Sequence, residues 1–274
     1  MDDVALNRVF HDHECGYYDE RFGIVHDEVS AHAAVTEVEQ LLGSRLRDGD
    51  VVVDVGCGTG WFAAGLTRLR PDVQVIGVDL SAGMLGKAAS AGATVLVQGD
   101  ATRLPFADGV VDVVVGRGVL HHLPDPVAAL REWRRVMRPS GAVVLSSEPT
   151  PIVETHGAWL VAAMLRLPGL RGGLTAEDEF WELAAMAANL HTFRPQELRD
   201  MAQSVGFQEV TVAASGFAET MAMTASYAMH GHAPNLAARL PWRRIATVGS
   251  QVDRAALDKV LPESWRHTLT GRFR

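Results

Sequence analysis

The sequence has little of what several classes of protein require. It holds only two cysteines in 274 residues, Cys15 and Cys57, so it has no disulfide framework and we expect a reducing, cytoplasmic setting. Basic residues number 25 against 33 acidic ones, and the formal charge of −8 argues against a nucleic-acid substrate. The first residues carry acids and histidines where a secretory signal would carry basic and then apolar residues.

Long hydrophobic runs are also missing. The longest apolar window, GAWLVAAML, ends just before Arg166 and is far shorter than the roughly 20 residues that span a bilayer, so we expect no membrane span. We expect no metal site either. A cluster near the N-terminus resembles metal ligands in composition, but its members are crowded into a polar terminal segment: His11, His13, Glu14 and Cys15.

What the chain does carry is a buried strand that leads into a glycine loop, VVVDVGCGTG at Val51–Gly60. The β-branched run at its start is typical of a strand covered on both faces. Gly56, Gly58 and Gly60 then allow a sharp turn and a close approach of a ligand to the backbone. A dinucleotide fingerprint would need a further glycine where Trp61 stands, so the GxGxG spacing argues against a nicotinamide-dependent oxidoreductase.

Strands and helices alternate strictly after this loop. The expected strands begin at Val51 and continue with Val73–Asp79, Thr94–Asp100, Val110–Gly118 and Gly141–Pro149, with helices at Phe62–Leu69, Ser81–Gly92 and Pro126–Met137. This order predicts right-handed crossovers, a parallel sheet and a ligand crevice at the carboxyl ends of the strands.

Acids end three of the expected strands: Asp79, Asp100 and Glu148. Asp79 lies 79 − 60 = 19 residues after Gly60, which is about where a nucleotide-binding unit places a carboxylate for ribose hydroxyls. The alternative for an isolated acid at a strand end is a turn or cap role.

Five segments in this order resemble the motifs of class I S-adenosylmethionine-dependent methyltransferases. They are DVGCGTG, VIGVDLS, QGDATRLPF, VVDVVVGRGVLHHLPDP and RPSGAVVLSSEP. The chain is most similar to the small-molecule branch related to the ubiquinone and menaquinone C-methyltransferases, over about residues 17–150 and 191–217. The resemblance implies a doubly wound, Rossmann-like α/β fold. Its seven-stranded sheet would be mostly parallel with an antiparallel edge strand, and helical lid insertions would follow strands 5 and 6.

The resemblance also implies S-adenosyl-L-methionine as cofactor, released as S-adenosyl-L-homocysteine. The loop glycines would face its methionine part, with Asp54 supporting the ammonium group, and Asp79 would hold the ribose hydroxyls. Leu80, Asp100 and Ala101 would meet the adenine. Arg117 departs from the pattern, since a bulky residue is less usual there. The full predicted cofactor set is Tyr17, Asp54, Gly56, Cys57, Gly58, Gly60, Asp79, Leu80, Asp100, Ala101, Gly116 and Arg117.

Candidates for acceptor chemistry follow the fourth and fifth strands. His121 and His122 stand where the methyl group should emerge, and a neutral histidine can accept a proton, although the alternative is structural packing. The candidate substrate contacts are Tyr18, Glu148 and Trp159. The alternative for Glu148 is that it only caps the following helix. The alternative for Tyr17 and Tyr18 is that they only pack the N-terminal helix onto the core.

We expect one domain built from five segments. They are a helical segment over the cofactor site (1–49, with a helix at Val29–Leu46), the cofactor-binding core (50–150), a helical lid insertion (151–192), a core helix and strand 6 (193–217), and a second helical insertion with the last strand (218–274). Two stretches compete for that strand, Trp265–Arg274 and Met221–Met229.

The sequence therefore predicts a methyltransferase that acts on O, N or C of a small, largely apolar metabolite such as a quinone or lipid. The alternative is a protein of this fold that binds the cofactor but catalyses a reaction other than methylation. A monomer and a homodimer are both compatible with the sequence.

Overall fold

The computed structural model describes residues 2–152, 156, 190–218, 221–222, 225, 245, 248–249, 251–260, 266 and 268–274. Most of the predicted lid insertion at 151–192 and most of the second insertion lie outside the described residues, as does Trp159.

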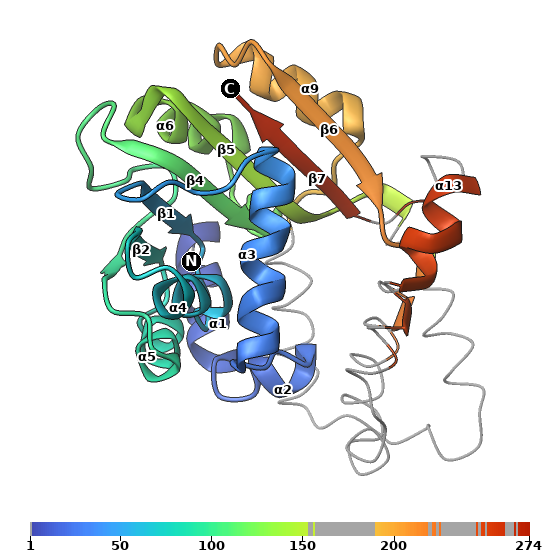
Figure 1. The fold of residues 1–274 in the computed structure, drawn as a ribbon, viewed down its shortest axis with the longest axis horizontal. Helices are drawn as coiled ribbons and strands as arrows, with labels where there is room; N and C mark the ends of the chain where they lie inside the picture. The colour runs from blue at the N-terminus through green and yellow to red at the C-terminus, as the bar shows by residue number, and fades with distance from the viewer. Residues whose placement is uncertain are drawn as a thin grey trace.

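Seven strands form one sheet in the order β3-β2-β1-β4-β5-β7-β6. Their bounds are β1 Val51–Val55, β2 Gln74–Asp79, β3 Leu96–Gln98, β4 Val111–Arg117, β5 Met137–Pro149, β6 Val210–Ser215 and β7 Thr268–Phe273. The first five pair in parallel, whereas β7 runs antiparallel between β5 and β6 (Figure 1). The predicted fold class is thereby confirmed, and the last strand falls within Trp265–Arg274.

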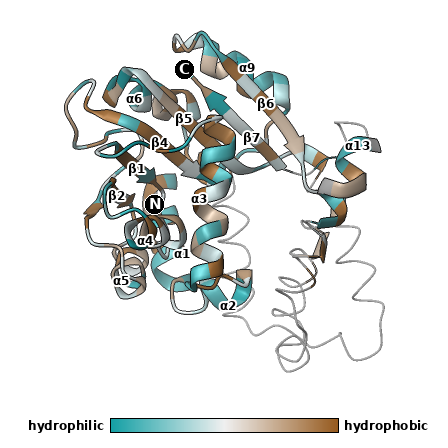
Figure 2. Cartoon of the chain, viewed as in Figure 1, coloured by the Kyte–Doolittle hydropathy of each residue, from teal (hydrophilic) through white to brown (hydrophobic). Residues whose placement is uncertain are grey.

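Helices cover both faces of the sheet because successive strand residues point to opposite sides. Val52 packs with buried residues of α3, α4 and α5, while Val53 packs with those of α6 and α9. These helices are α3 Glu28–Leu42, α4 Trp61–Leu69, α5 Ala82–Ala91, α6 Pro126–Val136 and α9 Pro195–Ser204. Figure 2 shows the consequence in β4, which is hydrophobic along most of its length, as a strand covered on both faces must be.

Local signals fix where the helices begin and end. Ser81, the predicted N-cap of α5, accepts a hydrogen bond from the Met84 amide at 3.0 Å. Asp125 caps α6 in the same way, with Pro126 at the first helical position. Gly43 ends α3 in the left-handed conformation, with φ of +70°, which glycine adopts without strain.

Two N-terminal helices complete the described fold, α1 Asp3–Glu14 and α2 Tyr18–Phe22. The sequence patterns predicted neither as a separate helix. Asp12 accepts hydrogen bonds from the Ser81 hydroxyl and the Gly83 amide, which ties α1 to the start of α5. Asp19 accepts one from the Thr59 hydroxyl at 2.6 Å, which ties α2 to the glycine loop. Figure 1 shows α1 and α5 side by side.

Three short elements also lie in the described part of the chain: the 3₁₀ turn η1 Leu120–His122 after β4, and η2 Asp253–Leu257 followed by α13 Asp258–Val260 before β7. The strand β3 is shorter than expected, because Asp100 lies two residues past its end, in a turn.

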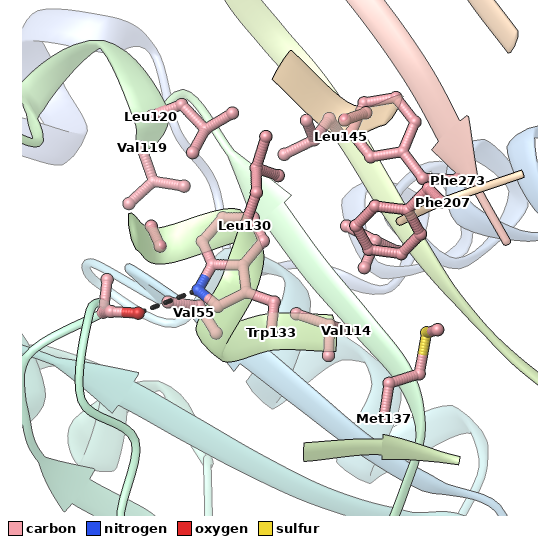
Figure 3. Close-up of a cluster of buried hydrophobic side chains, with 14 of the residues drawn as sticks. Val55, Val114, Val119, Leu120, Leu130, Trp133, Met137, Leu145, Phe207 and Phe273 are labelled. Atoms are coloured by element: carbon pink, nitrogen blue, oxygen red, sulfur yellow. Dashed lines mark hydrogen bonds between the residues drawn. The ribbon is translucent and has the colours of Figure 1, made fainter. Parts of the chain in front are cut away.

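The indole of Trp133 links the core to that turn. Its ring is fully buried among side chains such as Leu120, Leu130 and Leu145, and its Nε1 donates a 2.9 Å hydrogen bond to the carbonyl of Ala101 (Figure 3). The same residue therefore fills the hydrophobic core and holds the backbone that follows β3.

We expect Trp133→Phe to lower the free energy of unfolding by about 1 to 3 kcal/mol, because the Ala101 carbonyl loses its buried donor. Urea denaturation followed by circular dichroism measures this. The matched control is Trp61→Phe, at a half-buried ring that stacks with Arg117, where the cost should be smaller. Equal costs at the two sites would contradict the role assigned to the indole hydrogen bond.

Candidate functional site

A cavity of about 250 Å³ opens at the carboxyl ends of the parallel strands, where the alternating pattern predicted a crevice. Its walls come from Val55, Gly56 and Gly58 at the end of β1, Asp79 and Leu80 at the end of β2, and Asp100 to Thr102 after β3. The turn after β4 adds a further wall, and α1 and α2 close the remaining side with Val4, Asn7, His11 and Tyr18.

The three loop glycines are required for two different reasons. At Gly56, with φ of +68°, an added Cβ would meet Val119 at 2.5 Å, and at Gly60, with φ of +84°, it would meet Ala88 at 2.8 Å. These two glycines therefore permit close packing of the loop. At Gly58, which lines the cavity, a Cβ would meet nothing within 4 Å. A side chain there would occupy space that the loop leaves open to a ligand.

Asp79 joins the loop to the second strand. Its two carboxylate oxygens accept hydrogen bonds from the amides of Gly58 and Ser81, each at 2.8 Å. Burial raises the pKa of this carboxyl above its usual range, against the opposing effect of those amides. The side chain lines the cavity with a second lone pair on each oxygen available to a ligand.

Asp54 carries a buried carboxylate, one oxygen of which lacks a hydrogen-bond partner among the described residues. The residue is 2% exposed, and the oxygen without a partner is Oδ2. Burial, with the nearby negative charge of Asp79, raises the pKa of Asp54 to about 7. Two destabilised carboxylates beside one cavity favour a ligand that carries positive charge.

The turn after β3 is held rigidly. The Oδ1 atom of Asp100 accepts hydrogen bonds from the amide of Thr102 at 2.7 Å and from its hydroxyl at 2.8 Å, and the Ala101 carbonyl is bonded to Trp133. Asp100 and Ala101 both line the cavity. This arrangement presents a carboxylate and backbone groups at a fixed place, as recognition of a planar base requires.

Arg117 brings a cation to the cavity wall. Its guanidinium lies 4.6 Å from the ring centroid of Trp61, and its Nε lies 3.9 Å from a carboxylate oxygen of Glu37. Trp61, at the position where the dinucleotide fingerprint has glycine, therefore supports the unusual arginine by a cation–π contact.

The two adjacent histidines are placed differently. His122 lines the cavity, whereas His121 does not, and the Nδ1 of His121 lies 3.0 Å from Glu148. Glu148 is fully buried and also accepts hydrogen bonds from the amides of Val119, Leu120 and His121 at 2.9 to 3.1 Å. Its carboxylate holds the turn after β4 from behind the cavity wall.

The cavity thus gathers nine predicted site residues: Tyr18, Gly56, Gly58, Asp79, Leu80, Asp100, Ala101, Arg117 and His122. Seven others lie outside its lining: Tyr17, Asp54, Cys57, Gly60, Gly116, His121 and Glu148. Burial raises the pKa of the Cys57 thiol, which fits a small packing residue better than a nucleophile. A Cβ on Gly116 would meet Trp133 and Leu145 at 2.9 Å, so this glycine serves core packing. The roles of all these site residues toward a ligand stay predictions.

Sequence reasoning missed the residues of α1. Val4, Asn7 and His11 are spaced by three and four positions, so one face of the helix delivers all three to the cavity. That spacing, together with Asp2 as an N-cap, was the available signal.

Within the part of the chain that the structure describes, no cluster of three or more histidine, cysteine or acidic side chains could hold a metal ion. Nor is any helix there both long and apolar enough to cross a bilayer.

Comparison with known proteins agrees with this geometry. A family model described as a methyltransferase domain matches residues 53–145. A demethylmenaquinone methyltransferase of Staphylococcus aureus is 34% identical over 176 residues, which cover 61% of this chain and 71% of the relative.

Two solved structures share the fold. Phosphoethanolamine N-methyltransferase 2 of Haemonchus contortus, in complex with S-adenosyl-L-methionine, has a TM-score of 0.63 at 14% identity, over 97% of this chain and 59% of the other. The 4+2 cyclase SpnF has a TM-score of 0.53 at 18% identity, over 89% and 80%.

The sheet order, the glycine loop and the acid-lined cavity define a nucleotide-binding α/β protein of the methyltransferase type. Within this class, the chain belongs to the S-adenosylmethionine-dependent methyltransferases, and S-adenosylmethionine is its cofactor. The residues fit that group, because the open glycine loop and the carboxylate of Asp79 line the cavity, and Oδ2 of Asp54, on the strand that leads into the loop, is buried without a partner among the described residues.

Asp54 makes stability depend on pH in a testable way. Its pKa is about 7 in the folded protein and about 3.9 in an unfolded chain, so between these values the folded state keeps a proton that the unfolded state releases. The wild type should therefore lose stability relative to Asp54→Asn by about 1.4 kcal/mol for each pH unit between pH 4 and 7, and no more above that.

Urea denaturation of both proteins across pH 4.5 to 8.5 measures the difference. The buried amide of the variant can shift its free energy of unfolding by a constant amount at every pH. Such a shift does not affect the test, because the prediction concerns how the difference between the two proteins changes with pH. The control is Asp48→Asn, at a side chain that is 91% exposed, for which the curves should stay parallel to the wild type. Parallel curves for Asp54→Asn would contradict the raised pKa.

Proposed function

We propose that the protein transfers the methyl group of S-adenosylmethionine to O, N or C of a small, largely apolar acceptor. The observation that carries the proposal is the mixed lining of one cavity, which combines acids at the strand ends with apolar side chains such as Val4, Leu123 and Pro124. Similarity to a demethylmenaquinone methyltransferase supports an apolar acceptor of the quinone type.

The cofactor contacts are proposed residue by residue. Gly56 and Gly58 face the methionine part, with Asp54 supporting the ammonium group. Asp79 accepts hydrogen bonds from the ribose hydroxyls, and the turn residues after β3 meet the adenine together with Leu80.

Arg117 borders the methionine end, where its fixed guanidinium suits a carboxylate. The phenol of Tyr18 also reaches this cavity, and burial raises its pKa, so it stays protonated and can donate a hydrogen bond.

The bound cofactor supplies a methyl group already activated on a positively charged sulfur. The chain therefore needs to align the acceptor, exclude water and accommodate the charge that disappears on transfer. The N-terminal helices support exclusion of water, because Asp12 and Asp19 tie them over the cavity.

We expect Asp79→Asn to weaken S-adenosylhomocysteine binding about tenfold or more, because two ribose hydrogen bonds worth about 0.5 to 1.5 kcal/mol each are lost. Asparagine retains the size of the side chain, and titration calorimetry gives the affinity. Asp48→Asn serves as the exposed control and should bind as the wild type does. Unchanged affinity in Asp79→Asn would contradict the ribose contact.

Methyl transfer itself is tested with tritiated S-adenosylmethionine and three bicyclic probes: anaerobic 1,4-dihydroxynaphthalene, 1-naphthol and 1-naphthylamine. We expect label in the organic phase with at least one probe, and loss of that label with Asp79→Asn. Tight binding of S-adenosylhomocysteine without transfer to any acceptor would favour the alternative, a reaction other than methylation. The cyclase SpnF, which shares the fold, is named for such a reaction.

The setting of the enzyme is part of the proposal. The scarcity of cysteine and the buried thiol of Cys57 support a reducing cytoplasm. A monomer or a homodimer accounts for the features of the chain, and light scattering of the purified protein distinguishes them.

A further inference from the structure

We propose that His11, oriented by the buried carboxylate of Glu14, is the base that removes a proton from the acceptor as the methyl group arrives, and that Asn7 hydrogen-bonds the same acceptor group. The inference rests on the proposed methyl transfer. It names the acceptor chemistry as a hydroxyl or amine on an otherwise apolar molecule.

His11 and Glu14 form a pair on α1. The Nδ1 of His11 lies 2.8 Å from Oε1 of Glu14, whose side chain is only 3% exposed. A carboxylate can only accept a hydrogen bond, so at this distance Nδ1 carries the hydrogen and donates it, and Nε2 keeps its lone pair. Since the ring of His11 lines the cavity, Nε2 is the nitrogen available to an acceptor. A base oriented by an acid is the arrangement that general-base catalysis uses.

Asn7 supplies an independent observation. Its side chain is 5% exposed, and its Nδ2 donates to the carbonyl of Asp3 at 3.1 Å and to that of His122 at 3.0 Å. These two bonds fix which amide atom is the oxygen. That oxygen is buried and has no hydrogen-bond partner among the described residues, although Asn7 lines the cavity. A buried acceptor in this position calls for a donor from a ligand, and a hydroxyl or an amine provides one.

Charged and aromatic groups from three elements face His11. Glu14 contacts it from α1, and Asp79 at the end of β2 interacts with it electrostatically. The ring of His122, from η1, packs edge-on with centroids 5.0 Å apart. Asp12 on α1 holds the helix against α5, and the phenol of Tyr18 lines the same cavity as His11.

The proposed step balances as follows. A lone pair on the acceptor oxygen or nitrogen forms the new bond to the methyl carbon, and the electrons of the sulfur–carbon bond pass to sulfur, which becomes a neutral thioether. The proton of the acceptor group moves to Nε2 of His11, which becomes an imidazolium beside the Glu14 carboxylate. Solvent receives that proton after product release.

His121 is placed less well for this step. Its Nδ1 also meets a buried carboxylate, that of Glu148, but the ring does not line the cavity. His122 does line it and is the competing base, so the experiment includes His122→Gln.

The first experiment does not depend on methyl transfer. The full chain is labelled with ¹⁵N-histidine and saturated with S-adenosylhomocysteine, and the His11 signals are assigned by their loss in His11→Gln. We expect His11 to be the Nδ1–H tautomer at pH 8. An Nε2–H tautomer would overturn the proposal, because no lone pair would then face the acceptor.

The second experiment measures kcat, KM and the pH profile with whichever naphthalene probe accepts the methyl group. The hydroxyl probes and the amine probe separate the two acceptor classes. His11→Gln should lower kcat about 10²-fold or more and remove the fall in rate at acid pH, with unchanged affinity for S-adenosylhomocysteine. Glu14→Gln should lower kcat less, leave KM unchanged and move the acid limb to lower pH, because the protonated ring loses its counter-charge.

The matched controls are His32→Gln and Glu28→Gln, which alter an exposed histidine–glutamate pair on α3, 65% and 78% exposed. Both should keep the wild-type profile. The base role is overturned if His11→Gln keeps the acid limb, if His122→Gln removes it instead, or if His11→Gln weakens cofactor binding while kcat stays unchanged. Transfer to none of the probes would defeat the proposed function, while the tautomer of His11 would still test the pair.

Discussion

The buried carboxylate of Glu148 is the constraint on which the cavity wall depends. A regular strand would not turn this side chain under the neighbouring loop, but β5 changes register between Leu145 and Glu148, and Ser147 there takes a φ of +61°. The carboxylate then accepts hydrogen bonds from three successive amides of the turn after β4, which a hydrophobic side chain could not do. Through that turn it places Val119 against Gly56 and brings His122 to the cavity. Local strain in one strand thus positions residues of another.

The same turn connects the sheet to helix α1 and to the segment that precedes α9. The carbonyl of His121 accepts hydrogen bonds from the amides of Leu190 and His191, where the chain returns from the region after β5. The carbonyl of His122 accepts one from Asn7 on α1. Because both partners bond to carbonyls of the turn that Glu148 holds, helix α1 and the segment before α9 are held relative to the strand ends.

Much of the fold could be predicted because its signals are local. The valines of β1, the cap at Ser81 and the glycine loop each follow from their own neighbours, and these elements appear within a few residues of their expected bounds. Helix α1 could not be found by hydrophobic periodicity, because two of its three buried residues are polar: Asn7, Phe10 and Glu14. Burying these two side chains is tolerable because Glu14 pairs with His11 on the same helix, and Asn7 donates to the carbonyl of Asp3 and to the distant carbonyl of His122. The role of Glu148 was hidden because its partners lie 27 to 29 residues away.

Cofactor and acceptor recognition thus rest on different parts of the chain. The groups proposed for the cofactor stand at the ends of β1, β2 and β3, where the parallel sheet dictates that they converge. The groups proposed for the acceptor stand on α1 and η1, which are attached to the sheet by a few hydrogen bonds such as those of Asp12 and Asn7. A substitution on the cavity face of α1 changes the chemistry offered to the acceptor without disturbing any strand. The same fold is found in a methyltransferase and in a cyclase, so the fold alone does not decide which reaction takes place.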